Sequence, residues 1–397
     1  MTPINEDRLA ALIEEELPEL IKIRHELHAN PGVRFEEEYA SKLVQRELQN
    51  AGIQFRAGLA GGTGVLGHLP GAAPEAIGLR ADMDALPILE ENTFPYASTK
   101  PGFMHACGHD GHTTILLGAA RVLARVAKEH TLPRPVTFVF QPAEEGGAGG
   151  DLMVKDGALD GSIFPPPVKH MFGLHGWPEL ELGQIATRIG PITAATCVFQ
   201  ITVKGAGCHA AFPHYGRDPI VAAAAIISAT QSIVARNVDP LASAVVSITQ
   251  CNAGSATNII PEKCSLQGTI RTLDTKVTDL VQKRFSRIVE QTAQAYDCEA
   301  KVEYQLPNYP VTNNSAEAIG ILKKVLPHAD LGMAPVMGGE DFAYYSQVVP
   351  SGFFVIGLST KEKKVAGLHR STFDFNDDAI RVGVDAFCRL ALRRDEA

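Results

Sequence analysis

The sequence predicts an α/β fold, with a central and mostly parallel sheet flanked by helices, that is interrupted by an inserted ferredoxin-like α+β domain. Short apolar runs predict strands that lead into polar residues at four places, which is typical of an open α/β sheet with a functional crevice at the carboxyl ends of its strands. Residues 188–304 follow a different pattern, β-α-β-β-α-β, which is the order of a ferredoxin-like unit. The first pattern returns only after this segment, so we expect an insertion.

The domain boundaries follow from these patterns. We expect the α/β domain to consist of residues 1–187 and 305–397, with the inserted domain at residues 188–304. A chain of 397 residues with 45% hydrophobic content is long enough to form two domains with separate cores. We expect the inserted domain to cover the cleft of the first domain or to form a dimer.

The α/β domain begins with two predicted helices and a turn. Apolar residues at helical spacing predict a helix over residues 7–28 and a second helix over residues 36–51, which Gly52 should end. The segment 60–67, AGGTGVLG, lacks the Gly-Lys-Ser/Thr ending of a phosphate-binding loop and the helix that should follow it. This segment therefore predicts a hairpin or turn.

Each of the four predicted strands leads to residues that can bind a metal ion or transfer a proton. The strands at 76–80, 136–140, 172–174 and 353–356 lead, in that order, to Asp84, to Glu144 and Glu145, to His175 and to His369. A helix between the first two strands is predicted by the spacing of Ile115, Leu116, Ala119, Val122, Leu123 and Val126. Because parallel strands end at one edge of a sheet, these polar side chains should lie close together.

The inserted domain is predicted from four strands, of which the first alternates between apolar and polar residues, and from two helices. Strands are expected at 196–204, 244–249, 264–271 and 300–304, and helices at 217–236 and 276–296. The apolar run 219–234 is shorter than the roughly 20 residues that cross a bilayer, and it contains Ser228, Thr230, Gln231 and Ser232. We therefore expect a packed helix and no membrane span.

Composition and charge exclude several classes of protein. The net charge is −9, and no basic run appears in the sequence, which argues against a nucleic-acid partner. The acidic N-terminal stretch has no signal-peptide pattern. The seven cysteines contain no CxxC pair, so we expect reduced thiols and a cytoplasmic location.

Two adjacent acids, Glu144 and Glu145, follow a buried strand and precede a glycine-rich turn. Neighbouring carboxylates repel each other unless a positive group lies between them or one of them takes up a proton. Paired acids in a loop are also common as solvated surface charge, and the pair by itself does not decide between the two.

The segment Cys107-Gly108-His109 places a thiol and an imidazole on either side of one glycine, so that both can point to the same place. Thiolate and imidazole are good ligands for zinc and its first-row neighbours, although a histidine near a cysteine is commonly structural. Glu145, His175 and His369 are expected at the same edge of the sheet, and the five residues together are candidate ligands for two metal ions.

Five ordered motifs resemble one known family. They are MHACGHDGHT, QPAEEGG, GLHGWPELELG, GAGCHAAFPHYGRDP and GLHRSTFDF, and the similarity extends over about residues 20–387. Together they resemble the amidohydrolase branch of the co-catalytic metallopeptidase family, a family that includes aminoacylases. The branch includes hippurate hydrolases and auxin-conjugate (IAA-amino acid) hydrolases.

The resemblance implies a metal centre and a general base. It implies that two divalent ions (Zn, Mn, Ni or Co) are held by the five candidate ligands, Cys107, His109, Glu145, His175 and His369, with Cys107 as a thiolate that bridges both ions. Glu144 corresponds to the general base of the family, and Asp84 to the acid that orients a ligand histidine.

The resemblance also assigns residues of the inserted domain, which in this family is a dimerisation domain. His209 matches a histidine that reaches the substrate, in related enzymes that of the partner subunit, although a helix-start or packing histidine remains the alternative. Asn258 and Arg271 match positions that contact the substrate carboxylate. The pair Glu340-Asp341 matches a family signature without a role assigned to it.

The function implied by the resemblance is hydrolysis of the amide bond of N-acyl amino acids, to a carboxylic acid and a free amino acid, by a homodimer. The acyl group and the amino acid are left open. Two alternatives remain, namely a dipeptidase or carboxypeptidase that uses the same two-metal site, and a non-catalytic metal-bound dimer.

Overall fold

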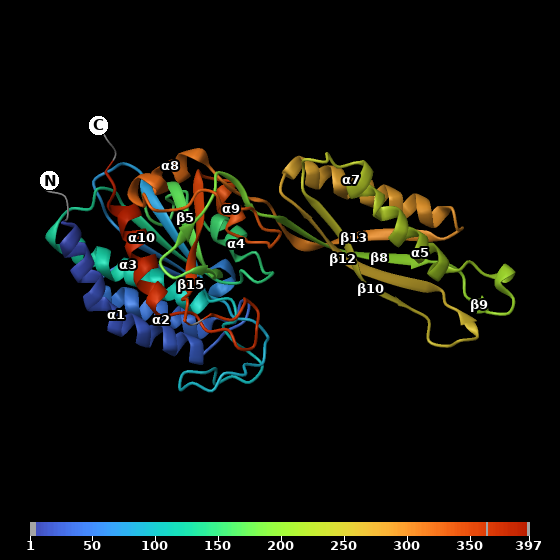
Figure 1. Cartoon of the computed structure of the whole chain (residues 1–397), viewed down its shortest axis with the longest axis horizontal. Helices are drawn as coiled ribbons and strands as arrows, with labels where there is room; N and C mark the ends of the chain where they lie inside the picture. The colour runs from blue at the N-terminus through green and yellow to red at the C-terminus, as the bar shows by residue number, and fades with distance from the viewer. Residues whose placement is uncertain (1–4, 363, 395–397) are drawn as a thin grey trace. The chain divides into compact units, whose positions relative to one another are not determined.

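The computed structural model describes residues 5–362 and 364–394, and these form two compact units (Figure 1). The first unit contains the residues up to Gly190, the segment Asn313–Ala334 and the residues from Asp341 onward. The second unit contains Pro191–Thr312 and Pro335–Glu340. The first few and last few residues of the predicted α/β domain lie outside the described residues.

The first unit is built on a seven-stranded sheet with the order β1-β2-β4-β3-β5-β15-β6. The four neighbouring strands β4, β3, β5 and β15 are parallel, and β1, β2 and β6 are antiparallel at the two sides. This sheet confirms the predicted fold class. The strands are β1 (Gln54–Leu59), β2 (Gly64–Leu69), β3 (Ala76–Asp82), β4 (Val136–Gln141), β5 (Val168–Glu181), β6 (Ile185–Ala186) and β15 (Ser351–Ser359).

The predicted hairpin at 60–67 is confirmed, because β1 and β2 pair as antiparallel strands joined by the short 3-10 helix η1 (Ala60–Gly62). The strand predicted at 172–174 is considerably longer than expected. Its neighbours β3 and β15 hold β5 in extended form from Val168 onward.

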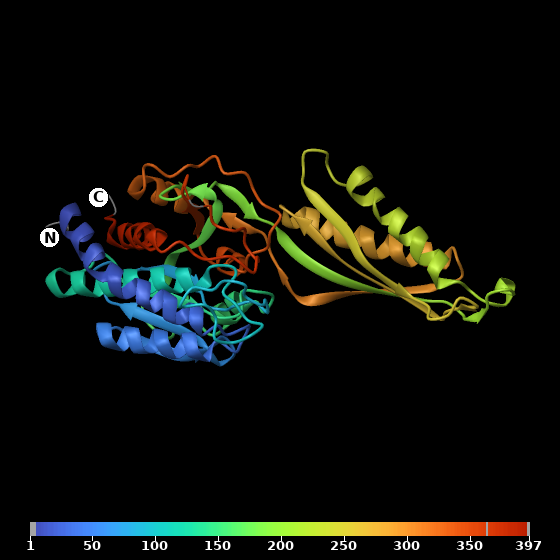
Figure 2. The same cartoon turned by 60° about the horizontal axis from the view of Figure 1, so that its bottom comes forward.

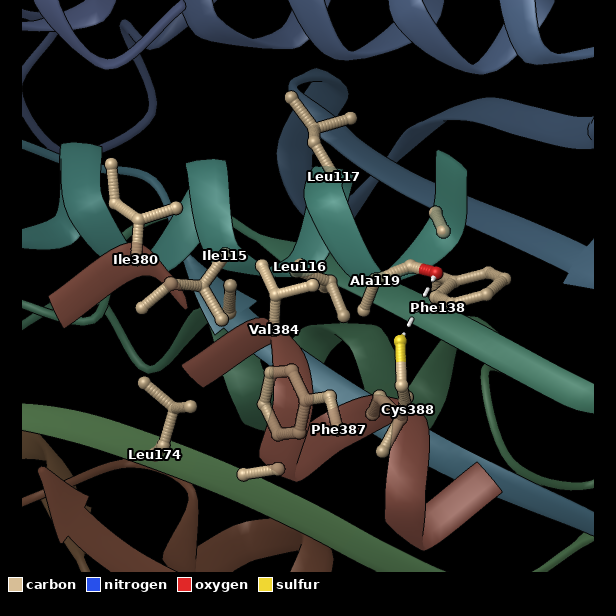
Figure 3. Close-up of a cluster of buried hydrophobic side chains, with 14 of the residues drawn as sticks. Ile115, Leu116, Leu117, Ala119, Phe138, Leu174, Ile380, Val384, Phe387 and Cys388 are labelled. Atoms are coloured by element: carbon tan, nitrogen blue, oxygen red, sulfur yellow. Dashed lines mark hydrogen bonds between the residues drawn. The ribbon is translucent and has the colours of Figure 1, made fainter. Parts of the chain in front are cut away.

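Seven helices accompany the described part of this sheet. They are α1 (Glu6–Ala29), α2 (Glu38–Ala51), α3 (His109–Glu129), α4 (Gly149–Lys155), α8 (Ala316–Val325), α9 (Ala343–Ser346) and α10 (Asp378–Leu392). Helix α3 packs against α1 and α10. Figure 3 shows Ile115 and Leu116 of α3 beside Val384 and Phe387 of α10, and all four side chains are fully buried. The predicted apolar face of α3 is thus part of the core, and it fixes the first turn of this helix relative to the sheet.

The second unit has a four-stranded antiparallel sheet with the order β10-β12-β8-β13. Its strands are β8 (Ala195–Lys204), β10 (Ala244–Ala253), β12 (Lys263–Thr272) and β13 (Glu299–Tyr309), and its helices are α5 (Pro219–Thr230), α6 (Ser232–Arg236) and α7 (Thr275–Gln294). Helices α5 and α7 pack against each other and lie on one face of the sheet (Figure 2). The chain order β8-α5-β10-β12-α7-β13 confirms the ferredoxin-like prediction.

The helix predicted at 217–236 is divided into α5 and α6 at Gln231. Thr230 and Ser232 donate side-chain hydrogen bonds to the carbonyl oxygens of Ile227 and Ala229, and such bonds compete with the regular helical pattern. Among the described residues, Pro219–Arg236 is the one helical stretch that by length and composition could cross a membrane, with a mean hydropathy of 1.4. Its residues Ala222, Ala223, Ile226 and Ile233 belong to the core of the second unit, as predicted for a packed helix.

The remaining short elements are β7 (Gly190–Thr193), β9 (Cys208–His209), the 3-10 helix η2 (Pro213–Tyr215), β11 (Ile259–Ile260) and β14 (Thr312–Asn314). Of these, β9 and β11 form a two-stranded antiparallel sheet within the second unit.

Candidate metal centre and active site

The carboxyl ends of the parallel strands bring the predicted site residues of the first unit together. Asp82, the last residue of β3, lies beside Gln141, the last residue of β4, and both strands then lead into the segments that carry Asp84 and Glu144. Each of two groups of three potential ligands has its ligand atoms within 4.8 Å of one another, and Cys107 belongs to both. One group is Cys107, His109 and His175, and the other is Cys107, Glu145 and His369.

The first group is oriented by hydrogen bonds from the far sides of its rings. The Nδ1 of His175 donates to the carbonyl oxygen of Gly176 at 2.7 Å, which leaves Nε2 as an acceptor that lies 3.3 Å from the Sγ of Cys107. The Nδ1 of His109 lies 3.2 Å from a carboxylate oxygen of Asp84, and its Nε2 is buried without a hydrogen-bond partner among the described residues. Both histidines therefore present an imidazole nitrogen to the space beside Cys107.

Two left-handed backbone positions lie at the candidate ligands. Gly108 has a φ of 87°, and a Cβ at this position would lie 3.0 Å from the ring of Phe375, so glycine suits the turn between Cys107 and His109. His369 has a φ of 61°, and its backbone N–H donates to the carbonyl oxygen of Ala106 at 2.8 Å. This bond ties His369 to the segment before Cys107, and the strained conformation is of a kind that clusters at functional sites.

Asp84 connects the candidate ligand His109 to the turn that carries the paired acids. Besides contacting His109, its carboxylate accepts the backbone N–H groups of Glu144 at 3.0 Å and of Glu145 at 2.9 Å. Asp84 thus contacts both a candidate ligand and the turn of the paired acids, and its orienting role stays a prediction.

The electrostatics of the group favour a cation. Burial, together with the carboxylate of Glu145, raises the pKa of the Cys107 thiol. Hydrogen bonds to Cys107 and Glu145 raise the pKa of His369 to about 10, and its Nε2 lies 3.3 Å from Glu145. A divalent ion would deprotonate the thiol and neutralise the carboxylate. The His109 Nε2, which has no hydrogen-bond partner within the described part of the chain, and the mixed set of sulfur, nitrogen and oxygen donors fit a zinc-like or first-row ion.

Glu144 lies beside the ligand groups without belonging to the two that share Cys107. Its side chain is buried, and one of its carboxylate oxygens accepts the backbone N–H of Asp341 at 3.3 Å. One of its carboxylate oxygens also lies within 4.8 Å of potential ligand atoms of His109 and Glu145. A buried acid in this position can exchange protons with a substrate held at the ligand groups.

The Asp341 side chain belongs to a buried polar network that the sequence reading did not anticipate. Its carboxylate accepts hydrogen bonds from Arg80 at 2.8 Å, from Gln141 at 2.8 Å and from the backbone of Gly150 at 2.9 Å. Arg80 also contacts Asp82 at 2.6 Å. The available signal was an arginine in an otherwise apolar strand, because a charged residue in such a strand is rarely buried unless it is paired.

His112 fills a structural position at the start of α3. Its Nδ1 lies 2.7 Å from Asp82, and its Nε2 accepts the backbone N–H of Gly176 at 2.8 Å. The ring therefore holds the strand that presents His175.

His209, which is predicted to take part in catalysis, and Asn258 and Arg271, which are predicted to bind the substrate, lie in the second unit. His209 is exposed on β9, opposite Ile259 of β11, and the backbone of Ala210 donates to the carbonyl oxygen of Asn258 at 2.9 Å. Arg271 lies on β12, where its guanidinium donates to Thr196 and Thr269. His209 and Asn258 are therefore neighbours, and the substrate contacts of all three residues stay predictions.

A family model described as peptidase family M20/M25/M40 matches residues 78–393 of the chain. The chain belongs to this peptidase family. The resemblance seen in the five motifs is thereby confirmed.

Individual M20 proteins are similar over nearly the whole chain. An N-acetyl-L-cysteine deacetylase of Bacillus subtilis (strain 168) is 40% identical over 366 residues, which cover 91% of this chain and 85% of the relative. An IAA-amino acid hydrolase, ILR1-like 2 of Arabidopsis thaliana, is 37% identical over 383 residues, covering 94% and 84%. A dinuclear metal-binding peptidase of the M20 family from Bacillus subtilis matches with a TM-score of 0.81 and 32% identity, covering 96% and 98%. The protein is an enzyme that hydrolyses carbon–nitrogen amide bonds.

Proposed function

We propose that this protein removes the acyl group from N-acyl amino acids by hydrolysing the amide bond, which yields a carboxylic acid and a free amino acid. The observation that carries this proposal is the position of Glu144, a buried carboxylate next to two groups of potential ligands that share Cys107. The similar proteins named as a deacetylase and as an amino acid conjugate hydrolase support this substrate class.

The residues proposed to hold two divalent ions are Cys107, His109, Glu145, His175 and His369, and zinc, manganese, nickel and cobalt are the candidate ions. Cys107 is proposed as the bridge because it belongs to both ligand groups. When bound, such ions polarise the amide carbonyl and lower the pKa of a coordinated water molecule.

Glu144 is proposed as the general base. Its carboxylate accepts a proton from the attacking water and then donates that proton to the departing amine. The backbone N–H of Asp341 donates a hydrogen bond to the carboxylate of Glu144. Asp84 accepts the backbone N–H groups of Glu144 and Glu145, and so it holds the backbone of both residues.

His209, Asn258 and Arg271 are proposed to bind the substrate, with the histidine donating to the oxyanion and the arginine pairing with the amino acid carboxylate. We propose a homodimer formed through the second unit. Support comes from β10, which is an outer strand of its sheet, and from exposed Ile220 and Val221 on α5. We also propose a cytoplasmic location.

The test is hydrolysis of a substrate panel by protein reconstituted separately with zinc, manganese, nickel or cobalt. The panel contains N-acetyl and N-benzoyl amino acids, an indoleacetyl amino acid and unmodified dipeptides. Faster hydrolysis of the N-acyl amino acids supports the proposal. Preference for dipeptides would replace it by a peptidase, and metal binding without hydrolysis of any substrate would replace it by a binding protein.

A further inference from the structure

A buried glutamate outside the ligand set contacts the turn that carries Glu144. Glu37 has no exposed surface. One oxygen of its carboxylate, Oε1, accepts the backbone N–H groups of Phe35 at 2.8 Å and of Ala143 at 2.9 Å. The other oxygen, Oε2, accepts the hydroxyl of Thr63 at 2.7 Å. Glu37 thus holds the residue immediately before Glu144.

The donors that contact this carboxylate are two peptide N–H groups and a hydroxyl, and none of these three carries a charge. Burying a carboxylate costs free energy, which neutral hydrogen bonds offset only in part. An apolar side chain would fill the same space without that cost. The contribution of the Glu37 side chain is therefore not packing alone. It also accepts three directed hydrogen bonds.

The segment around Glu37 contacts two parts of the active site. The carbonyl oxygen of Gly32 accepts the backbone N–H of Ala85, the residue after Asp84, at 2.8 Å. The side chain of Arg34 donates to the carbonyl oxygen of Gly146 at 2.8 Å. Residues 32–37 therefore connect the loop of Asp84 to the turn of Glu144 and Glu145.

The turn needs such support because its backbone is strained. Ala143 has a φ of 56°, in the left-handed region that is strained for any residue with a side chain. Ala143 is fully buried, so its N–H group would lose its acceptor if the Glu37 carboxylate were removed. A relaxation of Ala143 would rotate the next peptide and move the side chain of Glu144.

We propose that Glu37 is a positioning residue for the hydrolysis reaction. Its carboxylate fixes the backbone of Ala143 and thereby the direction of the Glu144 side chain, without contact to substrate or metal. This inference rests on the proposed role of Glu144 as the general base. It depends on hydrogen-bond acceptance by Glu37 and not on its charge.

The test compares three variants on the N-acyl amino acid that the enzyme hydrolyses fastest. Glu37→Met removes the acceptor, and kcat should fall on the order of tenfold to hundredfold. KM, metal content and melting temperature are recorded in parallel. KM and metal content should stay close to those of the parent. Glu37→Gln keeps an oxygen for both N–H groups and presents an amide that can donate to Thr63, so it should restore most of kcat. Glu38→Met, at the exposed neighbouring glutamate, is the matched control.

Equal kcat for Glu37→Met and the parent would overturn the inference, and so would a Gln variant as slow as the Met variant, because charge would then be what matters. Should Glu37→Met not fold, Thr63→Val serves instead. It leaves Oε2 without its donor, and kcat unaffected by this change would also overturn the inference. Glu144→Gln separates the two proposals: full activity of that variant would refute the base itself, whereas an inactive Glu144→Gln with a fully active Glu37→Met would refute only the role of Glu37.

Discussion

The backbone N–H of Glu144 donates to the same carboxylate oxygen of Asp84, at 3.0 Å, that lies 3.2 Å from the Nδ1 of His109. One oxygen atom thus fixes both the proposed base and a proposed metal ligand. A displacement of Asp84 would move both groups at once, so the geometry of the proton transfer is coupled to that of the metal centre.

Replacement of Glu144 by glutamine should abolish turnover and leave metal binding intact. The amide has nearly the shape of the acid but cannot accept a proton from water, and the loss in kcat should be on the order of a hundredfold to ten-thousandfold. Metal content by elemental analysis and steady-state kinetics on the same sample check this expectation. An active variant would remove Glu144 from its proposed role.

Replacement of Cys107 by alanine should lower the metal content of the protein. The Cys107 Sγ is the one donor shared by the two ligand groups described above, so its removal affects both sites. Titration with zinc followed by elemental analysis measures the loss. Cys251→Ala, at an exposed cysteine of the second unit, is the control, and full occupancy of the Cys107→Ala protein would contradict the bridge.

Replacement of Arg80 by methionine should destabilise the first unit strongly. Arg80 contacts Asp82 at 2.6 Å and Asp341 at 2.8 Å, with all three side chains fully buried. Removing one partner of a buried ion pair leaves a buried charge, which typically costs about 3–5 kcal/mol. Urea unfolding measures the free energy of unfolding. Arg381→Met, which removes an exposed pair with Glu14, should change it by less than about 1 kcal/mol, and equal effects would refute the distinction.

The buried pair of His28 and Asp110 predicts a loss of stability at alkaline pH. Burial disfavours the charged form of His28, but hydrogen bonds to Asp110 and Glu90 outweigh it and raise the pKa of His28 from 6.5 to about 9. A raised pKa in the folded state stabilises the protein fully below pH 6.5, and the contribution is lost as the pH rises through about 9. The melting temperature should therefore fall over this interval.

The matched variants are His28→Gln and His130→Gln. The first should melt at a lower temperature at pH 6 and show a smaller fall toward pH 9, because the titrating group is absent. The second changes an exposed histidine and should keep the slope of the parent. A parent protein whose melting temperature rises between pH 6.5 and 9 would contradict the assignment of His28.

Most of the fold could be predicted because its signals are local. The apolar face of α3 and the alternating burial of β8 follow from the spacing of neighbouring residues along the chain. The break at Gln231 was not predicted, because the hydroxyl groups of Thr230 and Ser232 donate to backbone carbonyl oxygens there. The spacing of apolar residues does not indicate such side-chain hydrogen bonds. The candidate ligands could be found because each follows a recognisable strand or adjoins a glycine turn.

By itself the sequence determined the order of the elements, the family and the residues that can carry the chemistry. Periodicity, turn residues and motifs each depend only on residues that are close together in the sequence. Only the tertiary structure decided which distant groups support that chemistry. The contacts of Asp341 with Arg80 and of Glu37 with Ala143 join segments that are far apart in sequence. A buried polar group leaves no local pattern that identifies its partner, because the partner is selected by the packing of the whole core around it.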